Sequence, residues 1–466
     1  MIWSASQLSE ALGVMVDNSI KTGQVQFNSQ DVQKNDLFIA LKGNRNGHAY
    51  VEDAFAHGAA AAIVSETIPG LSSTKIIMVD DTMDALYKLA IYKRQHSKAK
   101  FIGVTGSVGK TTTKDTIKTM LGAMACVFAS RGNFNNYLGV LINLASQPDD
   151  AEYAIFEMGM NHAGEIRELT KIVKPDIAVI TSVSEAHLEF FNSVLDIVDA
   201  KCEIFEGLTA NGTAVINLDS KYYGRMMLNI ERLNIKSVYN FGKAQAANAR
   251  LKIYEKLGEN VRLVYVVNGV EVTVTIPFVP EHYARNFAAA FMVISLLKLD
   301  LDIAAMQLSQ IELTVGRGKI IKARFGEKEC RLLCDYYNAN PESLKAAFSY
   351  LQQLESNKKM AIIGDMLELG DTAVQLHESV VPALIDSGVR KVILVGPTMQ
   401  RLKILLPDSI ESVCFDNVDL LCEELSNLIG GDELILIKGS RGMRLEKIVS
   451  CFKQVHNLID GVSNAV

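Results

Sequence analysis

Residues 103–115, GVTGSVGKTTTKD, join an apolar strand-like run to a helix-like run through a glycine-rich turn. In such a loop, several backbone N–H groups and the N-terminus of the following helix converge on one point and favour an anion there. Lys110 would reach the β- and γ-phosphates of a nucleotide, and the Thr111 hydroxyl would ligate Mg²⁺. Because strand, turn and helix in this order also begin a parallel-sheet unit, the stretch predicts both nucleotide binding and an α/β fold.

The loop departs from the widespread G-x-x-x-x-G-K-[ST] signature at its first glycine, where this chain has Val104. The eight residues that follow fit the shorter form T-G-x-x-G-K-T-T at every position. We expect all eight to contribute to nucleotide binding: Thr105, Gly106, Ser107, Val108, Gly109, Lys110, Thr111 and Thr112.

The composition narrows the classes of protein to consider. The 466 residues suffice for about three domains of ~100–200 residues each. A formal net charge of -6, without any dense Lys/Arg block, argues against a nucleic-acid partner. The seven cysteines are scattered and form no CxxC pair, which indicates reduced thiols in the cytoplasm rather than a disulfide framework or a zinc site.

The sequence shows no targeting or membrane-spanning pattern. Its N-terminal stretch, MIWSASQLSEALG, lacks a basic region followed by an apolar core. The longest apolar run, FAAAFMVISLL at 287–297, is about half the ~20 residues that a membrane span requires. We therefore expect a soluble cytoplasmic protein with no membrane span, acting as a monomer.

Strand-like and helix-like runs divide the chain into three sections. Residues 1–81 alternate short β-like runs with helical stretches, which predicts a small α/β unit. Residues 82–314 hold the glycine-rich loop, further strand and helix pairs, and an insert at 249–278 whose NG turn predicts a β-hairpin. Residues 315–466 restart the strand and helix order from RLLCDYYN to ELILIKGS, which predicts a second doubly wound domain.

Three further residues in the middle section could carry chemistry. Glu157 ends an apolar strand, at the edge where the crevice of a parallel sheet opens and a carboxylate can hold a metal. His187 follows the next buried-looking strand, and Lys201 lies in a partly acidic helical segment. Taken singly, a strand-end Glu is more often solvated, such a His is more often structural, and such a Lys is more often exposed.

The T-G-x-x-G-K-T-T loop, followed in order by these three residues, resembles the ATP-binding segment of the Mur ligase family and of its folate-ligase relatives. Mur ligases join an amino acid or a dipeptide to a carboxylate of a peptidoglycan precursor through an acyl phosphate. The resemblance implies that Glu157 and His187 bind a second Mg²⁺, beside the one held by Thr111. It also implies that Lys201 is carbamylated and supports that second ion.

The same resemblance implies roles for residues further along the chain. Asn286 takes the position that contacts adenine, although an Asn opening a helix is otherwise often a cap. Arg317 matches the arginine that meets the nucleotide phosphates from the third domain, and Asp335 matches the acid that binds ribose. Without the resemblance, these last two would be interpreted as a surface ion pair. The implied catalytic residues are Lys110, Glu157, His187, Lys201 and Arg317.

The segment YNANP at 337–341 has the form found in the family branch that adds a dipeptide. The resemblance therefore implies ATP and Mg²⁺ as cofactors, and UDP-N-acetylmuramoyl-tripeptide and D-alanyl-D-alanine as substrates, in peptidoglycan precursor synthesis. It implies an N-terminal UDP-binding domain, a central P-loop ATPase-like parallel-sheet domain and a C-terminal Rossmann-like domain. The candidate substrate-binding residues are Ser29, Asn135, Asn136, Asn338 and Asn340.

The chain departs from the family pattern mainly in its first section. Asn28 and Gln30 flank Ser29 where an Asp-Ser-Arg run is usual, Asn46 opens a run that is usually Asp-Gly-His, and Cys334 replaces the first of two paired acids. Two kinds of alternative remain open. Another ligase of this type would add a single amino acid or extend folate polyglutamate, and a non-catalytic nucleotide-regulated protein would bind ATP without yielding ADP.

Overall fold

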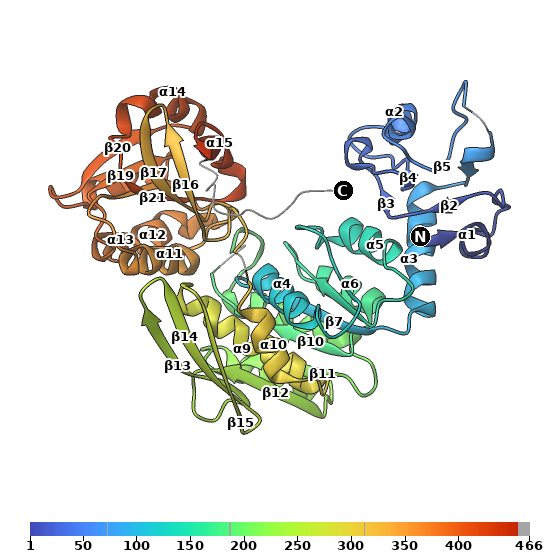
Figure 1. Cartoon of the computed structure of the whole chain (residues 1–466), viewed down its shortest axis with the longest axis horizontal. Coiled ribbons are helices and arrows are strands. Elements are labelled where there is room, and N and C mark those ends of the chain that lie inside the picture. The colour runs from blue at the N-terminus through green and yellow to red at the C-terminus, as the bar shows by residue number, and fades with distance from the viewer. Residues whose placement is uncertain (72, 186–187, 312, 455–466) are drawn as a thin grey trace.

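The protein, described here from a computed structural model, forms three lobes, each built on its own main sheet (Figure 1). The structure describes residues 1–71, 73–185, 188–311 and 313–454. The first lobe and the last lie on either side of the central one, which joins them (Figure 1). This arrangement confirms the α/β class expected from the order of strands and helices.

The first lobe contains a four-stranded parallel sheet and a short two-stranded ribbon. Its helices are α1 (Ala5–Leu12) and α2 (Val51–Ala56). The ribbon pairs β1 (Trp3–Ser4) with β2 (Lys21–Thr22). The sheet runs in the order β3 (Val25–Gln26), β4 (Leu37–Ile39), β5 (Ala61–Val64) and β6 (Ile76–Met78).

The central lobe is built on a nine-stranded sheet in the order β15-β14-β13-β12-β11-β10-β7-β9-β8. Its parallel part comprises β7 (Lys100–Thr105), β8 (Val127–Ala129), β9 (Tyr153–Glu157), β10 (Ile177–Ile180), β11 (Thr213–Asn217) and β12 (Ser237–Gly242). The predicted hairpin insert is a three-stranded antiparallel extension, in which β13 (Ala249–Leu257) also pairs in parallel with β12, followed by β14 (Asn260–Val267) and β15 (Val270–Pro277).

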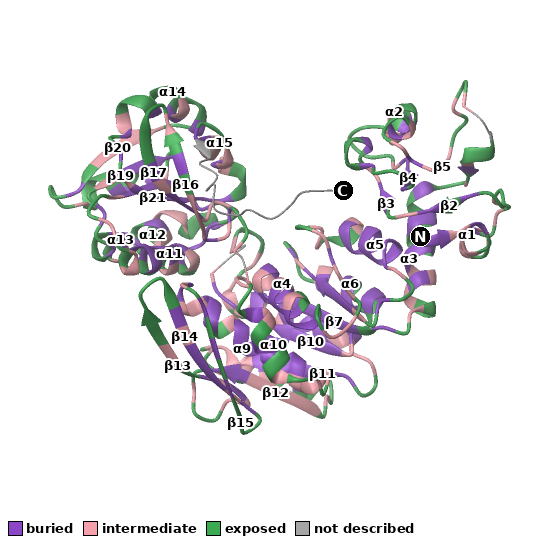
Figure 2. Cartoon of the chain, in the orientation of Figure 1, coloured by how far each residue is buried: buried purple, intermediate pink, exposed green. Residues whose placement is uncertain are grey.

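Helices cover both faces of this sheet and bury its strands (Figure 2). They are α3 (Thr82–His96), α4 (Lys110–Leu121), α5 (Tyr137–Ala145), α6 (Glu165–Val173), α7 (Val194–Cys202), α8 (Tyr223–Arg232), α9 (Glu281–Leu296) and α10 (Leu301–Leu308). Residues 287–294 of α9 are all buried, so the longest apolar run of the sequence is a core helix. No helix in the described ranges is long and apolar enough to span a membrane.

Val104 has a structural role in this core. The residue lies on β7, is fully buried, and belongs to the same apolar cluster as Ile117 and Met120 of α4. A glycine here would leave a void beneath α4, the helix that follows the glycine-rich loop. The departure from the common loop signature is therefore explained by packing between β7 and α4.

The third lobe holds a seven-stranded sheet in the order β20-β19-β18-β21-β17-β16-β22. The strands are β16 (Lys319–Phe325), β17 (Lys328–Cys334), β18 (Lys359–Gly364), β19 (Lys391–Val395), β20 (Glu411–Phe415), β21 (Leu434–Lys438) and β22 (Lys453–Gln454). The helices are α11 (Pro341–Gln353), α12 (Ala373–Glu378), α13 (Val381–Asp386), α14 (Val418–Leu428) and α15 (Glu446–Ser450). The five strands from β17 to β21 are parallel where they pair, and the antiparallel strands β16 and β22 were not expected.

Candidate active site

At two points the glycine-rich loop has a backbone conformation that only glycine adopts readily. Gly106 has φ 150° and Gly109 has φ 86°. A Cβ at Gly109 would lie 2.5 Å from Asn286 Nδ2, so the loop and α9 approach each other there. Asn286, which the resemblance places at the adenine, is therefore a neighbour of the loop, and it is not a helix cap, because Pro280 occupies that position of α9.

Lys110 begins α4 and folds back over the loop. Its Nζ donates to the Gly106 carbonyl oxygen at 2.7 Å. Burial lowers the pKa of Lys110, while the Glu157 carboxylate raises this pKa and the Arg317 cation lowers it. The ammonium group is thus held in a partly desolvated position, from which a phosphate oxygen could replace the carbonyl as its partner.

Glu157 lies at the end of β9 and is held from three sides. Thr111 Oγ1 donates to Glu157 Oε2 at 2.6 Å, and Asn135 Nδ2 donates to Glu157 Oε1 at 2.8 Å. The Glu157 backbone N–H donates to Ser130 Oγ at 3.0 Å. A hydroxyl and a carboxylate oxygen at this separation are the hard ligands that Mg²⁺ prefers, and they lie close enough to share one ion. The residues present therefore fit a magnesium ion.

The third expected metal ligand, His187, lies outside the described residues. Within the described ranges, no group of three or more His, Cys, Asp and Glu side chains could hold a metal. The fit to magnesium consequently depends on Thr111 and Glu157.

Lys201 is buried on α7, with 1% of its surface exposed. Burial lowers its pKa well below the usual value, and the nearby Lys110 cation lowers it further. Among the described residues, Lys201 forms no ion pair with a carboxylate. The acidic neighbours in the sequence do not serve Lys201, because Asp199 pairs with Arg225 and Glu203 accepts the Gly164 and Arg167 backbone N–H groups.

A cavity of 480 Å³ opens between the glycine-rich loop, α9 and the third lobe. Its lining brings together most of the residues singled out in the sequence, from the central lobe and from the third. Those residues are Ser107, Val108, Gly109, Lys110, Thr111, Thr112, Asn135, Glu157, Asn286, Arg317, Asp335, Asn338 and Asn340. Thr105 and Gly106 lie in the same loop but do not line this cavity.

Arg317 and Asp335 do not form the surface ion pair considered as an alternative. The Arg317 guanidinium stacks on the Tyr337 ring, with its carbon 3.8 Å from the ring centroid. Lys438 Nζ donates to Asp335 Oδ2 at 2.7 Å. Burial raises the pKa of Asp335, whereas Lys438 and Arg317 lower it. Tyr337 and the buried Lys438, which also line the cavity, are site residues that the sequence interpretation missed.

Two of the candidate substrate residues serve as helix caps. Asn136 Oδ1 accepts the Gly139 N–H at 2.9 Å at the start of α5, and Asn136 does not line the cavity. Asn340 Oδ1 accepts the Ser343 N–H at 2.8 Å and forms a capping box at the start of α11. Their spacing in the sequence also fits this local structural role.

Ser29 lies in the first lobe, buried in a short 3₁₀ turn, and does not line the cavity. The side chains beside it are bonded within that lobe. Asn28 Oδ1 accepts the Gln30 backbone N–H at 3.3 Å, and Gln30 Nε2 donates to Asp53 Oδ2 at 2.9 Å. Asn28 and Gln30, where the chain departs from the family pattern, therefore stabilise the conformation of this turn and its contact with Asp53.

Two family models match the chain: the Mur ligase middle domain over residues 104–294, and the glutamate ligase domain of Mur ligases over residues 316–441. A UDP-N-acetylmuramoyl-tripeptide--D-alanyl-D-alanine ligase of Rickettsia prowazekii is 50% identical over 453 residues, covering 97% of this chain and 100% of the relative.

Solved structures show the same likeness. A MurF crystal structure from Acinetobacter baumannii has a TM-score of 0.80 and 28% identity, with 97% of this chain and 98% of that chain covered. The MurF ligase from Thermotoga maritima in complex with ADP has a TM-score of 0.76 and 27% identity, with 93% of this chain and 97% of that chain covered.

Proposed function

The chain belongs to the MurF branch of the Mur ligase family, and we propose that it joins D-alanyl-D-alanine to UDP-N-acetylmuramoyl-tripeptide at the expense of ATP. The observation that carries the proposal is the single cavity in which the phosphate-type loop and Glu157 face Arg317 and Asp335 of the third lobe. We assign UDP binding to residues 1–81, ATP binding to 82–314 and the closing ligase domain to 315–466. The reaction would supply a cytoplasmic peptidoglycan precursor.

The proposed reaction has two steps. An oxygen of the terminal carboxylate of the tripeptide attacks the γ-phosphorus of ATP, which releases ADP and leaves an acyl phosphate. The amine of D-alanyl-D-alanine then attacks the acyl carbon and gives a tetrahedral intermediate. When this intermediate collapses, an amide forms, inorganic phosphate leaves with one of the former carboxylate oxygens, and the amine proton passes to solvent.

The first step brings two anions together, so it needs fixed positive charge. Lys110 would hold the β- and γ-phosphates, and Arg317 would meet the transferring phosphoryl group from the third lobe. Asp335, to which Lys438 donates a hydrogen bond, would accept hydrogen bonds from the ribose, and Asn286 would contact the adenine. Magnesium held by Thr111, and a second ion held by Glu157 with His187 as the family resemblance implies, would add charge stabilisation and in-line positioning. Because the two sets of residues belong to different lobes, we expect turnover to require their closure.

Phosphate release tests this proposal directly. Release with UDP-linked tripeptide, ATP and D-alanyl-D-alanine should exceed release with any single amino acid in place of the dipeptide. Preference for a single amino acid, or for a folate with glutamate, would establish a different ligase of the family. Tight ATP binding without ADP formation from any of these substrate sets would establish the non-catalytic alternative.

Gly109→Ala is expected to raise the Kd for ADP about 10-fold or more. Alanine would let the ligand-free loop relax out of the left-handed conformation, and regaining that conformation to bind ADP would cost about 1–2 kcal/mol, where 1.4 kcal/mol is tenfold in affinity. The new Cβ would also displace the Asn286 side chain. Isothermal titration with ADP measures the effect, and Gly224→Ala is the matched control because nothing lies within 4 Å of a Cβ at Gly224. An unchanged Kd would contradict the placement of the nucleotide.

We further propose that Lys201 is carbamylated, since a fully buried lysine near Lys110 is costly as a cation. Its neutral amine would add to CO₂ and lose a proton, which gives a carboxylate on a long stem. We expect phosphate release by the wild type to fall in CO₂-depleted buffer and to recover with bicarbonate. Lys201→Met should be about 100-fold slower, the scale of losing a key electrostatic group, and should not respond to bicarbonate. A wild-type rate independent of CO₂ would rule the modification out.

A further inference from the structure

One loop of the central lobe contacts both the first lobe and the candidate catalytic carboxylate. Residues 131–135 lie between β8 and α5. At one end of the loop, Arg131 Nη1 donates to Gln24 Oε1 at 2.7 Å and Arg131 Nη2 donates to the Val25 carbonyl oxygen at 3.2 Å. The ring of Phe134 packs on that of Phe27, with centroids 5.9 Å apart. The loop thus contacts β3 and the residues on either side of it, Gln24 and Phe27.

The other end of the loop holds Glu157. Asn135 Nδ2 donates to Glu157 Oε1 at 2.8 Å, and the Gly159 N–H donates to the Asn135 carbonyl oxygen at 2.9 Å. Two glycines make room for this course. A Cβ at Gly139 would lie 2.5 Å from the Phe134 carbonyl carbon, and a Cβ at Gly159 would lie 2.8 Å from Asn135 Oδ1. Residues 131–135 are therefore closely packed between the first lobe and Glu157.

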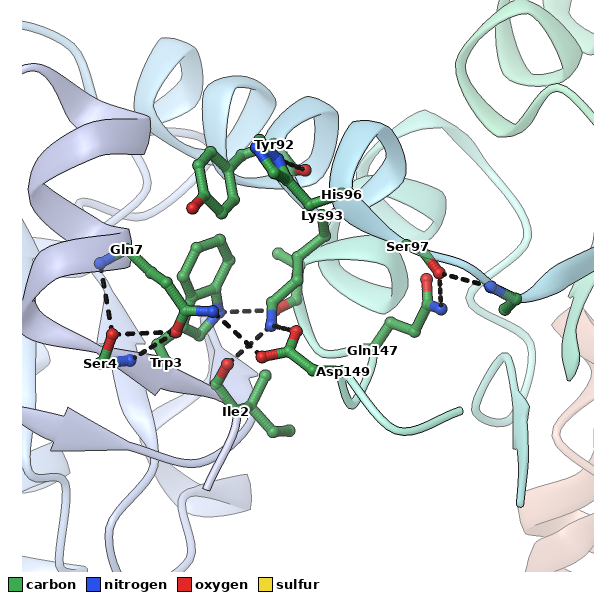
Figure 3. Close-up of polar contacts among 12 residues, drawn as sticks. Ile2, Trp3, Ser4, Gln7, Tyr92, Lys93, His96, Ser97, Gln147 and Asp149 are labelled. Atoms are coloured by element: carbon green, nitrogen blue, oxygen red, sulfur yellow. Dashed lines mark hydrogen bonds and ion pairs between the residues drawn. The ribbon is translucent and has the colours of Figure 1, made fainter. Parts of the chain in front are cut away.

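A separate set of contacts, called here the joint, holds the first lobe against the central lobe (Figure 3). It is formed by Ile2, Trp3, Lys93, Ala145 and Asp149. Lys93 of α3 is buried, donates to the Ile2 carbonyl oxygen at 2.6 Å and to Asp149 Oδ1 at 2.5 Å, and lies 4.5 Å from the Trp3 ring centroid. Trp3 Nε1 donates to the Ala145 carbonyl oxygen at 2.7 Å. This joint docks the first lobe through residues other than Arg131 and Phe134.

We propose that Arg131 and Phe134 are positioning residues for the ligase reaction, which set the orientation of Glu157 through Asn135 according to where the first lobe lies. The inference rests on the proposed function, in which the first lobe holds the UDP end of the acceptor. Phe27 immediately precedes the turn that contains Ser29, so a shift of that turn on substrate binding reaches Phe134 directly. The path then continues through one backbone link to Asn135 and through one hydrogen bond to Glu157.

A double-mutant cycle tests the path. Arg131→Met and Asn135→Ala should each lower kcat about 10-fold, because misplacement of a catalytic group by about 1 Å can cost up to ~100-fold. The double variant should be no slower than the slower single variant, since both changes break the same path. The KM for UDP-linked tripeptide should stay within about threefold. Arg262→Met, on the exposed hairpin, is the matched control and should leave kcat unchanged.

Two readouts separate positioning from loss of docking. Trp3 is the sole tryptophan of the chain, so unchanged emission in Arg131→Met shows that the joint of Figure 3 is intact. Hydrogen exchange of the ligand-free protein needs no turnover, and Arg131→Met should speed exchange at the Gly159 amide but not at the Trp3 joint. Phe27→Leu provides a second variant at the same contact, with the same expected exchange pattern.

Additive losses of kcat in the cycle would overturn the inference, and so would a change confined to KM or an unchanged Gly159 exchange rate. A wild type that releases no phosphate with the tripeptide and dipeptide would instead refute the proposed function. In that case the exchange experiment still decides whether Arg131 controls the position of the loop.

Discussion

Lys110→Ala is expected to lower phosphate release by more than about 100-fold, the scale seen when a preorganised charge is removed from a developing anion. Lys110 is the cation of the loop, and both burial and the nearby Arg317 cation lower its pKa. Its side chain forms hydrogen bonds only within the loop, to the Gly106 and Ser107 carbonyl oxygens among the described residues. The fold should therefore remain intact.

The measurement is steady-state phosphate release, with circular dichroism to verify folding. Lys118→Ala is the matched control, because Lys118 lies on the same helix but is exposed. Near-normal turnover of Lys110→Ala would contradict the assignment of nucleotide binding to this loop. A comparable loss in Lys118→Ala would show that the effect comes from the helix and not from the charge.

Glu157→Gln is expected to slow turnover by about 100-fold or more, since it removes the only formal negative charge among the described magnesium ligands while keeping the side chain's shape. One amide oxygen can still accept from Thr111 or from Asn135, but not from both. The KM for magnesium should rise together with the loss of kcat. Titration of phosphate release with Mg²⁺ measures both quantities.

Glu168→Gln, on the exposed face of α6, is the matched isosteric control and should behave as the wild type. If Glu157→Gln kept its magnesium dependence and its rate, Glu157 would be a structural acceptor for Thr111 and Asn135 alone. The proposed ion would then need other ligands.

Local features were predictable because neighbouring residues decide them. The loop at 103–115 is fixed by glycine conformations and a helix start, and the turn at Asn268 and Gly269 is fixed by its own backbone requirement. The packing of Val104 could not be predicted from its neighbours in the sequence. Its reason lies in α4, whose apolar face packs onto β7 only after the unit has folded.

Long-range pairs explain what the sequence interpretation missed. Lys438 meets Asp335 because β21 lies beside β17, although about a hundred residues separate the two in the sequence. Exposure of Lys201, the alternative that its partly acidic segment left open, does not occur, because its acidic neighbours bond to Arg225 and to backbone N–H groups instead. In both cases the strand order and the helix orientation decide the partner, and neither can be derived from spacing.

The central claim is that this enzyme activates a carboxylate as an acyl phosphate, and transfer of an isotope tests it most directly. UDP-linked tripeptide labelled with ¹⁸O in its terminal carboxylate is turned over with ATP and D-alanyl-D-alanine, and the inorganic phosphate is analysed by mass spectrometry. The mechanism predicts one ¹⁸O atom in each phosphate released. Phosphate without the label, formed alongside the amide product, would contradict the account.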